Sequence, residues 1–302
     1  MPTMPTVGVI GTGAMGLGVV QSLLRNGFPV LARDIRPEAE AAAVAAGAMA
    51  RPTPAALARD SSIVIVLVVD AAQIETVLFG AGGAATALAP GAIVIVSSTV
   101  APAFVASLGK RLAATGARLL DAPVSGGPQR AADGTMTIMV AGDTATIGEC
   151  SPLLTAIGGK CFVVGAQPGA AATFKVLNNQ LAAVNLAAGA EAMALAIRAG
   201  VDPRLFLEVV NASSGASWIF ADRMKRALDG DQTPRAATAL LNKDVSIAVS
   251  AAATLEFDAP LARAARDAFA AAVAAGYGPE DDAAMLQFYQ DRSREATAPS
   301  SK

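Results

Sequence analysis

The sequence contains no histidine among its 302 residues. A chain without histidine has no Ser-His-Asp triad, no histidine metal ligand and no histidine general base. Acid–base chemistry must therefore use Lys, Asp, Glu, Tyr or Cys. Cysteine is also scarce, and we expect Cys150 and Cys161 to be small buried thiols rather than a redox pair. No metal site is predicted.

The sequence also lacks a strong excess of charge. Lys and Arg number 23 against 25 Asp and Glu, which gives a net charge of −2, and no basic stripe suits nucleic-acid phosphates. Hydrophobic residues make up 53% and the mean hydropathy is +0.48, but no uninterrupted apolar run reaches the roughly 18 residues of a membrane span. Residues 1–6 lack the basic and apolar segments of a secretory signal. We expect a cytoplasmic protein with no nucleic-acid or membrane partner.

Short apolar runs alternate with helical stretches in the first half of the chain. These predicted strands cover residues 7–10, 29–32, 63–69, 92–97, 118–122, 135–141 and 161–165. Such alternation predicts a mostly parallel sheet wrapped by helices. After Gly165 the strand signals stop and Ala- and Leu-rich helices follow. The sequence therefore predicts an α/β chain, with a doubly wound Rossmann-type domain at 1–167 and an all-helical domain at 168–302.

A long helix is expected over about residues 170–199, where it would join the two domains. At 1.5 Å per residue it would be roughly 45 Å long. It is apolar nearly all round, which predicts a buried connector. Lys175 and Asn179 stand four residues apart on one face, with Asn178 beside them. Burial of polar side chains costs free energy, so their presence on a buried helix indicates a role, and catalysis is one such role.

A glycine motif follows the first predicted strand. Gly11-Thr-Gly-Ala-Met-Gly16 comes directly after residues 7–10 and precedes a helical stretch, which is the required context of a dinucleotide-binding loop. Gly11 permits the tight turn, Gly13 lets the backbone approach the pyrophosphate, and Gly16 allows close packing of helix on strand. We predict that the whole loop, Thr12, Ala14 and Met15 included, binds the cofactor.

Asp34 ends the second predicted strand, where a carboxylate can accept hydrogen bonds from the adenosine ribose. It favours NAD as the cofactor. Arg33 and Arg36 flank it and could attract the 2′-phosphate of NADP, which we consider the second choice. The alternative for Asp34 is a plain turn residue at a strand end.

Four segments in this order resemble the β-hydroxyacid dehydrogenase family. They are residues 11–16, residues 121–127 (Asp-Ala-Pro-Val-Ser-Gly-Gly), residues 169–179 and residues 242–244 (Asn-Lys-Asp). The resemblance covers nearly the whole chain. One departure is Ala171, where the family usually has a second glycine. The family includes 3-hydroxyisobutyrate dehydrogenases, tartronate semialdehyde reductases and L-threonate dehydrogenases, and it transfers a hydride between a hydroxy acid and NAD(P).

The resemblance implies a role for residues in each segment. Lys175 would be the general acid and base, and a buried helix would suit it because desolvation lowers the pKa of a lysine. Asn179 would orient the substrate hydroxyl or the ammonium group. Ser125, Gly126 and Gly127 would bind the carboxylate of the substrate. Lys243 would contact the cofactor and the substrate, and Asp244 would support that lysine. Further contacts with the cofactor would come from Val68, Val69 and Thr99.

The C-terminal half resembles the L-threonate dehydrogenase branch in residues 217–223, 230–235 and 276–282. A four-carbon sugar acid needs buried polar partners for its extra hydroxyls, so L-threonate or a close stereoisomer is the expected substrate. That branch tends to have histidine where this chain has Tyr277. The alternatives are 3-hydroxyisobutyrate or tartronate semialdehyde as substrate, with Trp218 and Phe220 simply in the core and residues 280–282 at a helix N-terminus.

Two further expectations follow from the family. Its members are dimers or tetramers held together by their helical domains, so we expect a homodimer or homotetramer. A dinucleotide-binding module that has lost catalysis is the non-enzyme alternative, and the presence of Lys175 argues against it.

Overall fold

The computed structural model describes residues 4–231 and 233–295. The chain divides into two compact units, Met1–Lys175 and Val176–Lys302. The division falls inside the long helix that the sequence predicts between two domains, rather than in the loop before it. The start of that helix, including Lys175, therefore belongs to the first unit.

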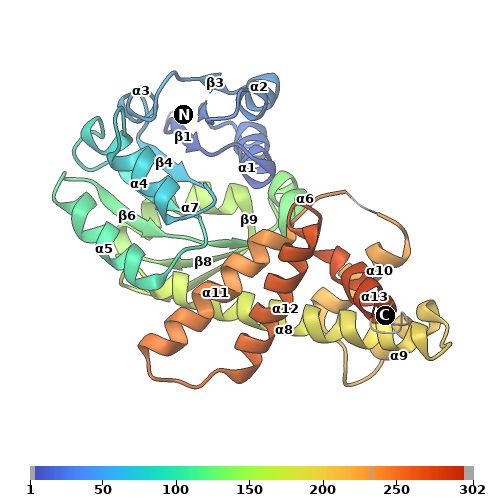
Figure 1. Ribbon diagram of the computed structural model, residues 1–302. Coiled ribbons are helices and arrows are strands. Elements are labelled where there is room, and N and C mark those ends of the chain that lie inside the picture. The colour runs from blue at the N-terminus through green and yellow to red at the C-terminus, as the bar shows by residue number, and fades with distance from the viewer. Residues whose placement is uncertain (1–3, 232, 296–302) are drawn as a thin grey trace. The chain divides into compact units, whose positions relative to one another are not determined.

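The first unit is an α/β domain built on a single sheet (Figure 1). Its strands are β1 Val7–Ile10, β2 Val30–Arg33, β3 Met49–Ala50, β4 Ile63–Val66, β5 Ile93–Val96, β6 Arg118–Asp121, β7 Val124–Ser125, β8 Met136–Ala141 and β9 Gly158–Gly165. Its helices are α1 Ala14–Arg25, α2 Pro37–Ala45, α3 Pro54–Arg59, α4 Ala71–Phe79, the 3-10 turn η1 Ala84–Thr86, α5 Pro102–Ala113, α6 Gly127–Asp133 and α7 Thr144–Ile157.

The sheet has the strand order β3-β2-β1-β4-β5-β6-β8-β7, with β9 paired to β8. Strands β1 to β6 run parallel, as the sequence predicts, whereas β8 is antiparallel to both β6 and β7. Strands β3 and β7 were not predicted, because two residues are too few to show a periodic pattern. Since β1 lies between β2 and β4, the loops that follow these three strands lie next to one another.

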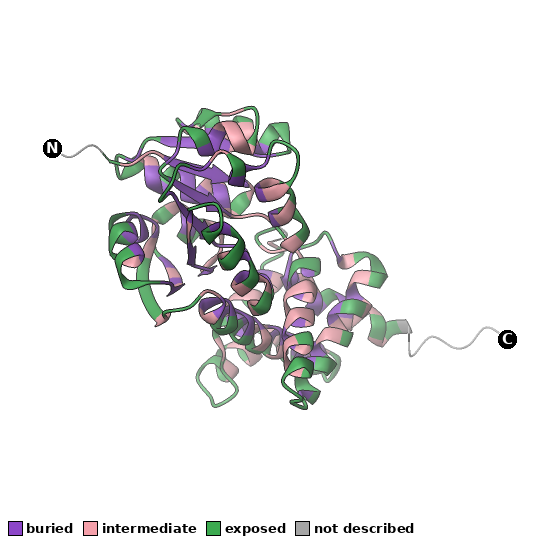
Figure 2. Cartoon of the chain, turned by 90° about the vertical axis from the view of Figure 1, so that its left-hand side faces the viewer, coloured by how far each residue is buried: buried purple, intermediate pink, exposed green. Residues whose placement is uncertain are grey.

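The central strands are buried on both faces, which explains their continuous apolar sequences (Figure 2). Along β4, Ile63 and Ile65 pack with residues of α1 and α7 on one face. The alternate residues Val64 and Val66 pack with residues of α3, α4 and α5 on the other face. Helices therefore cover both faces of the sheet, as in a doubly wound fold.

The second unit is helical. It contains most of α8 Ala170–Arg198, then α9 Pro203–Asn211, α10 Trp218–Leu228, α11 Thr238–Thr254, α12 Pro260–Ala272, the π turn η2 Val273–Tyr277, the 3-10 turn η3 Asp282–Ala284 and α13 Met285–Glu295. Its core joins residues from α8, α10, α11, α12 and α13, among them Met193, Met224, Val245, Phe269 and Met285. The all-helical second half matches the sequence-based expectation.

Helix α8 begins at the predicted residue and ends one residue before the predicted end. By length and composition alone α8 could cross a membrane, because its most apolar 18-residue window has a mean hydropathy of 1.4. The core helices of soluble proteins meet the same criterion. Burial on all sides was expected, but one side is exposed. Leu177, Leu181 and Leu195 are 54%, 63% and 66% exposed, whereas Leu186 and Met193 are fully buried.

Candidate functional site

The glycine loop between β1 and α1 is shaped by two glycines. Gly11 has a φ of +93°, a conformation that side chains other than glycine rarely adopt. A Cβ atom on Gly16 would lie 1.9 Å from the carbonyl oxygen of Gly11, so only glycine fits there. Gly13 is the N-cap residue of α1. The loop therefore brings bare backbone to a helix N-terminus, an arrangement that binds phosphate in dinucleotide-binding folds.

Asp34 follows β2 and is 7% exposed. Its carboxylate accepts hydrogen bonds from the backbone N–H of Thr12 at 2.7 Å and of Arg36 at 2.9 Å. The guanidinium of Arg36 lies 3.4 Å from the same carboxylate. A Cβ atom on Gly13 would lie 2.9 Å from that guanidinium. Arg36 therefore lies over the glycine loop, where either a ribose or a 2′-phosphate would have to be recognised.

The loops after β4 and β5 carry the other residues expected at the cofactor. Val68 and Val69 follow β4, and Thr99 follows β5. The two loops are joined by Ser98, whose hydroxyl accepts a hydrogen bond from Val68 N at 2.9 Å. This role of Ser98 was not predicted, although the residue is one of three consecutive hydroxyl residues at the end of β5.

The loop expected to bind a carboxylate begins in β7. Ser125 is the second residue of that strand and pairs with Thr137 of β8. Gly126 and Gly127 follow with φ values of +140° and +77°, and Gly126 is the N-cap residue of α6. The two glycines permit a sharp reversal directly after the serine.

The lysine and asparagine of the third segment are both buried. Lys175 and Asn179 are each 8% exposed and lie one turn apart on α8. Asn179 donates a hydrogen bond from Nδ2 to Asp244 Oδ2 at 2.7 Å and accepts one from Asn178. Asp244 also forms an ion pair with Lys243, at 2.8 Å from its Nζ. In the second unit the structure thus brings together Asn179, Lys243 and Asp244.

The chain is similar to known proteins over almost its whole length. The family model described as the NAD binding domain of 6-phosphogluconate dehydrogenase matches residues 6–165, and the model described as NAD-binding of NADP-dependent 3-hydroxyisobutyrate dehydrogenase matches residues 169–289. The chain is 47% identical over 283 residues to an L-threonate dehydrogenase of Cupriavidus necator, covering 94% of this chain and 95% of that protein. The chain belongs to the β-hydroxyacid dehydrogenase family.

More distant members and a solved structure extend the same likeness. The human mitochondrial 3-hydroxyisobutyrate dehydrogenase is 31% identical, with 94% of this chain and 87% of that protein covered. A crystal structure described as 3-hydroxyisobutyrate dehydrogenase from Salmonella typhimurium superposes with a TM-score of 0.87 at 40% identity, covering 94% and 99% of the two chains. The protein is therefore a nicotinamide-dependent hydroxyacid dehydrogenase with a Rossmann-type domain and a helical domain.

The residues present fit the dinucleotide that this dehydrogenase family uses. The close approach of Gly16 to Gly11 leaves no room for a Cβ atom. The N-cap residue of α1, Gly13, has no side chain to bind the first N–H groups of the helix, so a phosphate can bind them. Thr12, Ala14 and Met15 complete the loop, and the Asp34 carboxylate stands beside it. The backbone at Gly13 would lie against the pyrophosphate, with the turn at Gly11 and the packing at Gly16 shaping the loop, and Asp34 would hold the adenosine ribose.

The three C-terminal segments that resemble the L-threonate branch meet in one ion-pair network of the dehydrogenase. Arg223 binds Asp282 through Nε at 2.5 Å, and Arg226, three residues beyond the first segment, lies 3.0 Å from Asp281. Arg235 donates its backbone N–H to Asp281 at 2.8 Å. The charged groups of these segments thus bind one another, and Asp281 also caps η3, as the helix N-terminus alternative expected. Gln232, in the second segment, lies outside the described residues.

Two expectations for these segments differ from the structure. Phe220 is in the core at 3% exposed, but Trp218 is 64% exposed and is therefore not a core residue. Asp282 is 3% exposed at its side chain, and burial raises its pKa to about 6, although the neighbouring Arg223 guanidinium lowers it. A carboxyl group with this pKa titrates close to neutral pH.

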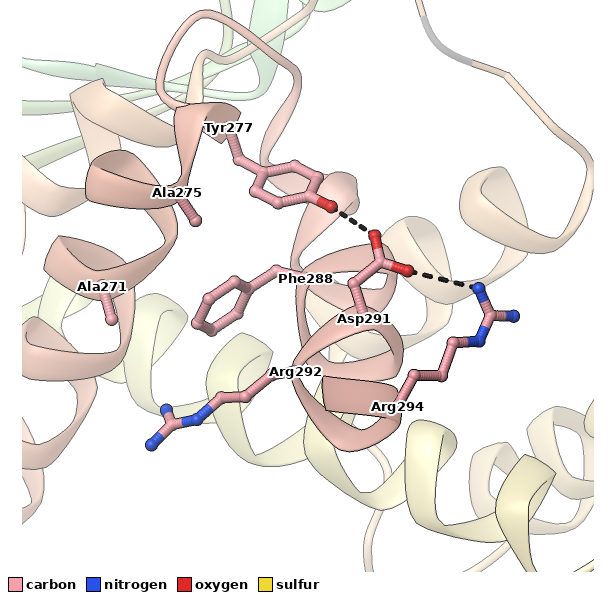
Figure 3. Close-up of a pocket in the computed structure, with 7 residues that line it drawn as sticks. All are labelled: Ala271, Ala275, Tyr277, Phe288, Asp291, Arg292 and Arg294. Atoms are coloured by element: carbon pink, nitrogen blue, oxygen red, sulfur yellow. Dashed lines mark hydrogen bonds and ion pairs between the residues drawn. The ribbon is translucent and has the colours of Figure 1, made fainter. Parts of the chain in front are cut away.

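A surface pocket of about 600 Å³ lies in the helical domain of the dehydrogenase (Figure 3). Its lining includes Tyr277, which donates a hydrogen bond to Asp291 at 2.6 Å, and Arg294, which pairs with the same carboxylate. The hydrogen bond from Tyr277 lowers the pKa of Asp291. Tyr277 comes from a segment that resembles the L-threonate branch, but none of the residues expected to bind the cofactor or to act in catalysis lines this pocket.

The two cysteines differ from each other. Cys150 is buried, and burial raises the pKa of its thiol to about 12, so it is an unreactive core residue. Cys161 is exposed on β9, contrary to the expectation that both thiols are buried. Among residues 4–231 and 233–295, no three His, Cys, Asp or Glu side chains come together as a metal site.

Proposed function

We propose that the enzyme oxidises L-threonate or a similar four-carbon sugar acid with NAD, and that Lys175 is its general acid and base. The observation that carries the substrate class is the high identity to proteins named L-threonate dehydrogenase, five of which match between 39% and 47% over 94% of this chain. The observation that supports Lys175 is its burial on α8 one turn before Asn179.

The chemistry needs one proton acceptor and one hydride acceptor. NAD, held by the glycine loop and Asp34, would supply the hydride acceptor for the carbon that carries the hydroxyl. The neutral amine of Lys175 takes the proton from that hydroxyl as the carbonyl forms, and in the reverse direction the ammonium returns it. Both electrons of the C–H bond leave with the hydride, so the Lys175 side chain changes only its protonation state.

The neighbouring residues would orient the substrate. Ser125, with the backbone of Gly126 and Gly127, would bind the carboxylate, because a hydroxyl and flexible N–H groups suit that anion. Asn179 would position the substrate hydroxyl or the Lys175 ammonium, and its own amide is held by Asp244. Lys243, paired with Asp244, would reach the cofactor and substrate.

NAD is proposed over NADP because Asp34 is buried and ionisable beside the glycine loop. A carboxylate there accepts hydrogen bonds from the ribose hydroxyls and repels a 2′-phosphate. Arg33 and Arg36 act in the opposite sense, and both are already paired with carboxylates: Arg33 with Glu40 and Arg36 with Asp34.

A second candidate substrate is 3-hydroxyisobutyrate. It is favoured by the Salmonella typhimurium structure, which carries that name at 40% identity. The charged C-terminal residues do not decide between the two, because they bind one another. Tartronate semialdehyde is a third member of the same class. We also propose that the enzyme acts in the cytoplasm as a homodimer or homotetramer.

Steady-state kinetics on a panel of acids tests the proposal. The panel contains L-threonate, D-threonate, D-erythronate, glycerate and 3-hydroxyisobutyrate, with NAD reduction followed by the absorbance of the reduced nicotinamide. We expect the highest kcat/KM for L-threonate or a stereoisomer, because a site built for hydroxyls leaves its polar groups unpaired against a methyl group. A clear preference for 3-hydroxyisobutyrate would replace the substrate assignment, and NAD binding without turnover of any acid would contradict the enzyme assignment.

A further inference from the structure

Asp121 connects two parts of the proposed active site, and neither the motif nor the mechanism above gives its side chain a role. It is the last residue of β6 and is 1% exposed. The chain runs from it through Ala122 and Pro123 into β7, which ends at Ser125. The residue is thus four positions before the serine proposed to bind the substrate carboxylate.

The carboxylate of Asp121 binds the N-terminus of α8. Its Oδ2 accepts hydrogen bonds from the backbone N–H of Gly169 at 2.8 Å and of Ala172 at 3.1 Å. Burial raises the pKa of Asp121, while these N–H groups act against that rise by stabilising the ionised form. Helix α8 is thus capped by a residue from a distant strand rather than by its own N-cap side chain.

The reason for this cap lies in Gly169. Its φ is +99°, and a Cβ atom there would lie 2.7 Å from the carbonyl oxygen of Pro102. No Ser, Thr, Asp or Asn can therefore stand at the N-cap position, where these residues normally supply the capping oxygen. Asp121, at the end of β6, supplies that oxygen instead.

The start of α8 is also fixed by packing. Ala171 is fully buried, and Ala172 is 3% exposed within the core cluster that contains strand residues of β4 and β5. Lys175 follows Ala172 by three residues, roughly 4.5 Å further along the helix axis. Within the first unit, the position of Lys175 is therefore set by the same turn that Asp121 holds.

We propose that Asp121 is a positioning residue, which sets the helix of Lys175 against the loop of Ser125 by capping α8 from the end of β6. This inference rests on the proposed roles of those two residues. A displacement of about 1 Å between reacting groups can lower a rate by about 100-fold, so a loosened cap should appear in turnover even where folding is retained.

The test compares Asp121→Ala with Asp121→Asn, which keeps an acceptor oxygen. We expect Asp121→Ala to lower kcat about 100-fold, with the KM for NAD unchanged, and Asp121→Asn to regain most of that activity. Gly169→Ala, which disturbs the same junction from the helix side, should resemble Asp121→Ala and keeps the inference testable if Asp121→Ala does not fold.

Asp143→Ala is the matched control. Asp143 caps α7 in the same unit by accepting a hydrogen bond from Thr146 N at 3.0 Å, and it belongs to no part of the proposed site. Its loss should lower the midpoint of thermal unfolding without changing kcat. If Asp121→Ala behaved like Asp143→Ala, losing stability while keeping kcat, Asp121 would be only structural and the inference would be overturned.

Hydrogen–deuterium exchange separates this inference from the proposed function. In Asp121→Ala, amides at the start of α8 should exchange faster than in the wild type, whereas in Asp143→Ala they should not. This readout requires no substrate. Unchanged exchange at Gly169 and Ala172 would contradict the capping role, whereas changed exchange in an enzyme that turns over no hydroxy acid would contradict the proposed function instead.

Discussion

The carboxylate of Asp34 accepts a hydrogen bond from the backbone N–H of Thr12 at 2.7 Å and thereby joins the end of β2 to the glycine loop. The same carboxylate lies 3.4 Å from the Arg36 guanidinium. The geometry of the loop and the proposed preference for NAD therefore both rest on this side chain. A variant that keeps the hydrogen bond but removes the charge separates the two effects.

Asp34→Asn should shift the cofactor preference toward NADP. The amide oxygen can still accept from Thr12, whereas the repulsion of a 2′-phosphate is lost and Arg36 is released from its ion pair. We expect the ratio of kcat/KM for NADP to that for NAD to rise about 10- to 100-fold, since hydrogen bonds to charged groups contribute about 1.5–3 kcal/mol. Asp60→Asn, in a separate ion pair with Arg51, should leave the ratio unchanged. Equal efficiency with both cofactors in the wild type would contradict the role of Asp34.

Lys175→Ala should remove proton transfer while keeping cofactor binding. We expect kcat to fall by about 10² to 10⁴, the usual contribution of a general base, with the Kd for NAD nearly unchanged. Lys175→Arg should be almost as inactive, because arginine keeps its proton at neutral pH. Lys160→Ala, an exposed lysine on β9, is the matched control and should keep full activity. A Lys175→Ala enzyme that retained about a tenth of wild-type turnover would exclude this lysine as the base.

The parts of this molecule that were predictable from sequence are those in which local geometry dictates the residue type. Gly11 and Gly16 are glycines because a positive φ and a close backbone contact allow nothing else. The strands β4 and β5 were predicted because burial on both faces demands unbroken Ile and Val. Helix α8 was predicted almost to the residue, because no Pro or strand signal interrupts it.

What escaped prediction depends on partners that are distant in sequence. The cap from Asp121 to Gly169 requires the folded sheet, and no local pattern announces it. The segments that contain Arg223 and Asp282 were interpreted as indicating a polar substrate, but these two side chains form an ion pair with each other across 59 residues of sequence. A charged residue has the same local signature whether it binds a ligand or another side chain, so the sequence alone cannot separate these cases.

Leu181→Glu should weaken the proposed homo-oligomer. Phe174, Leu177, Leu181 and Leu195 are all more than half exposed. With the exposed Ala188 they follow one another along α8 at steps of three, four, seven and seven residues, which places them on one side of the helix as in a coiled-coil seam. A helix from a second copy of this chain suits such a row. Analytical ultracentrifugation should show a smaller species for Leu181→Glu at concentrations at which the wild type is a dimer or tetramer.

The matched control for the oligomer is Leu255→Glu. Leu255 is 78% exposed but is the C-cap residue of α11, and the exposed Phe257 and Leu261 that follow it lie outside that helix, so no helical row includes Leu255. The same substitution there should leave the sedimentation coefficient unchanged. A monomeric wild type, or equal effects of the two variants, would show that the exposed row on α8 is not the subunit interface.

Asp282→Asn should change how stability depends on pH. The pKa of Asp282 in the folded protein is about 6, against 3.8 for an ordinary aspartate, because burial penalises the charge. Between these two pH values the carboxyl group is protonated in the folded state and ionised in the unfolded state. The folded state then binds more protons, so this group makes stability fall as the pH rises through that window and level off above it.

Asparagine has no proton to lose, so this contribution is absent from the variant. The free energy of unfolding of Asp282→Asn minus that of the wild type should therefore rise by about 2 to 3 kcal/mol between pH 4 and pH 6.5, at about 1.4 kcal/mol for each pKa unit. Urea denaturation at each pH measures the difference. The ion pair with Arg223 forms only with the ionised carboxylate, so its effect is already contained in the pKa of Asp282. Exchange of the protonated carboxyl for an amide adds an offset that does not depend on pH. Asp291→Asn is the control, because the pKa of Asp291 is lowered by the hydrogen bond from Tyr277 and its titration falls below this window. A difference that stayed flat for Asp282→Asn would mean that the Arg223 guanidinium keeps Asp282 ionised throughout, with the ion pair outweighing the cost of burial.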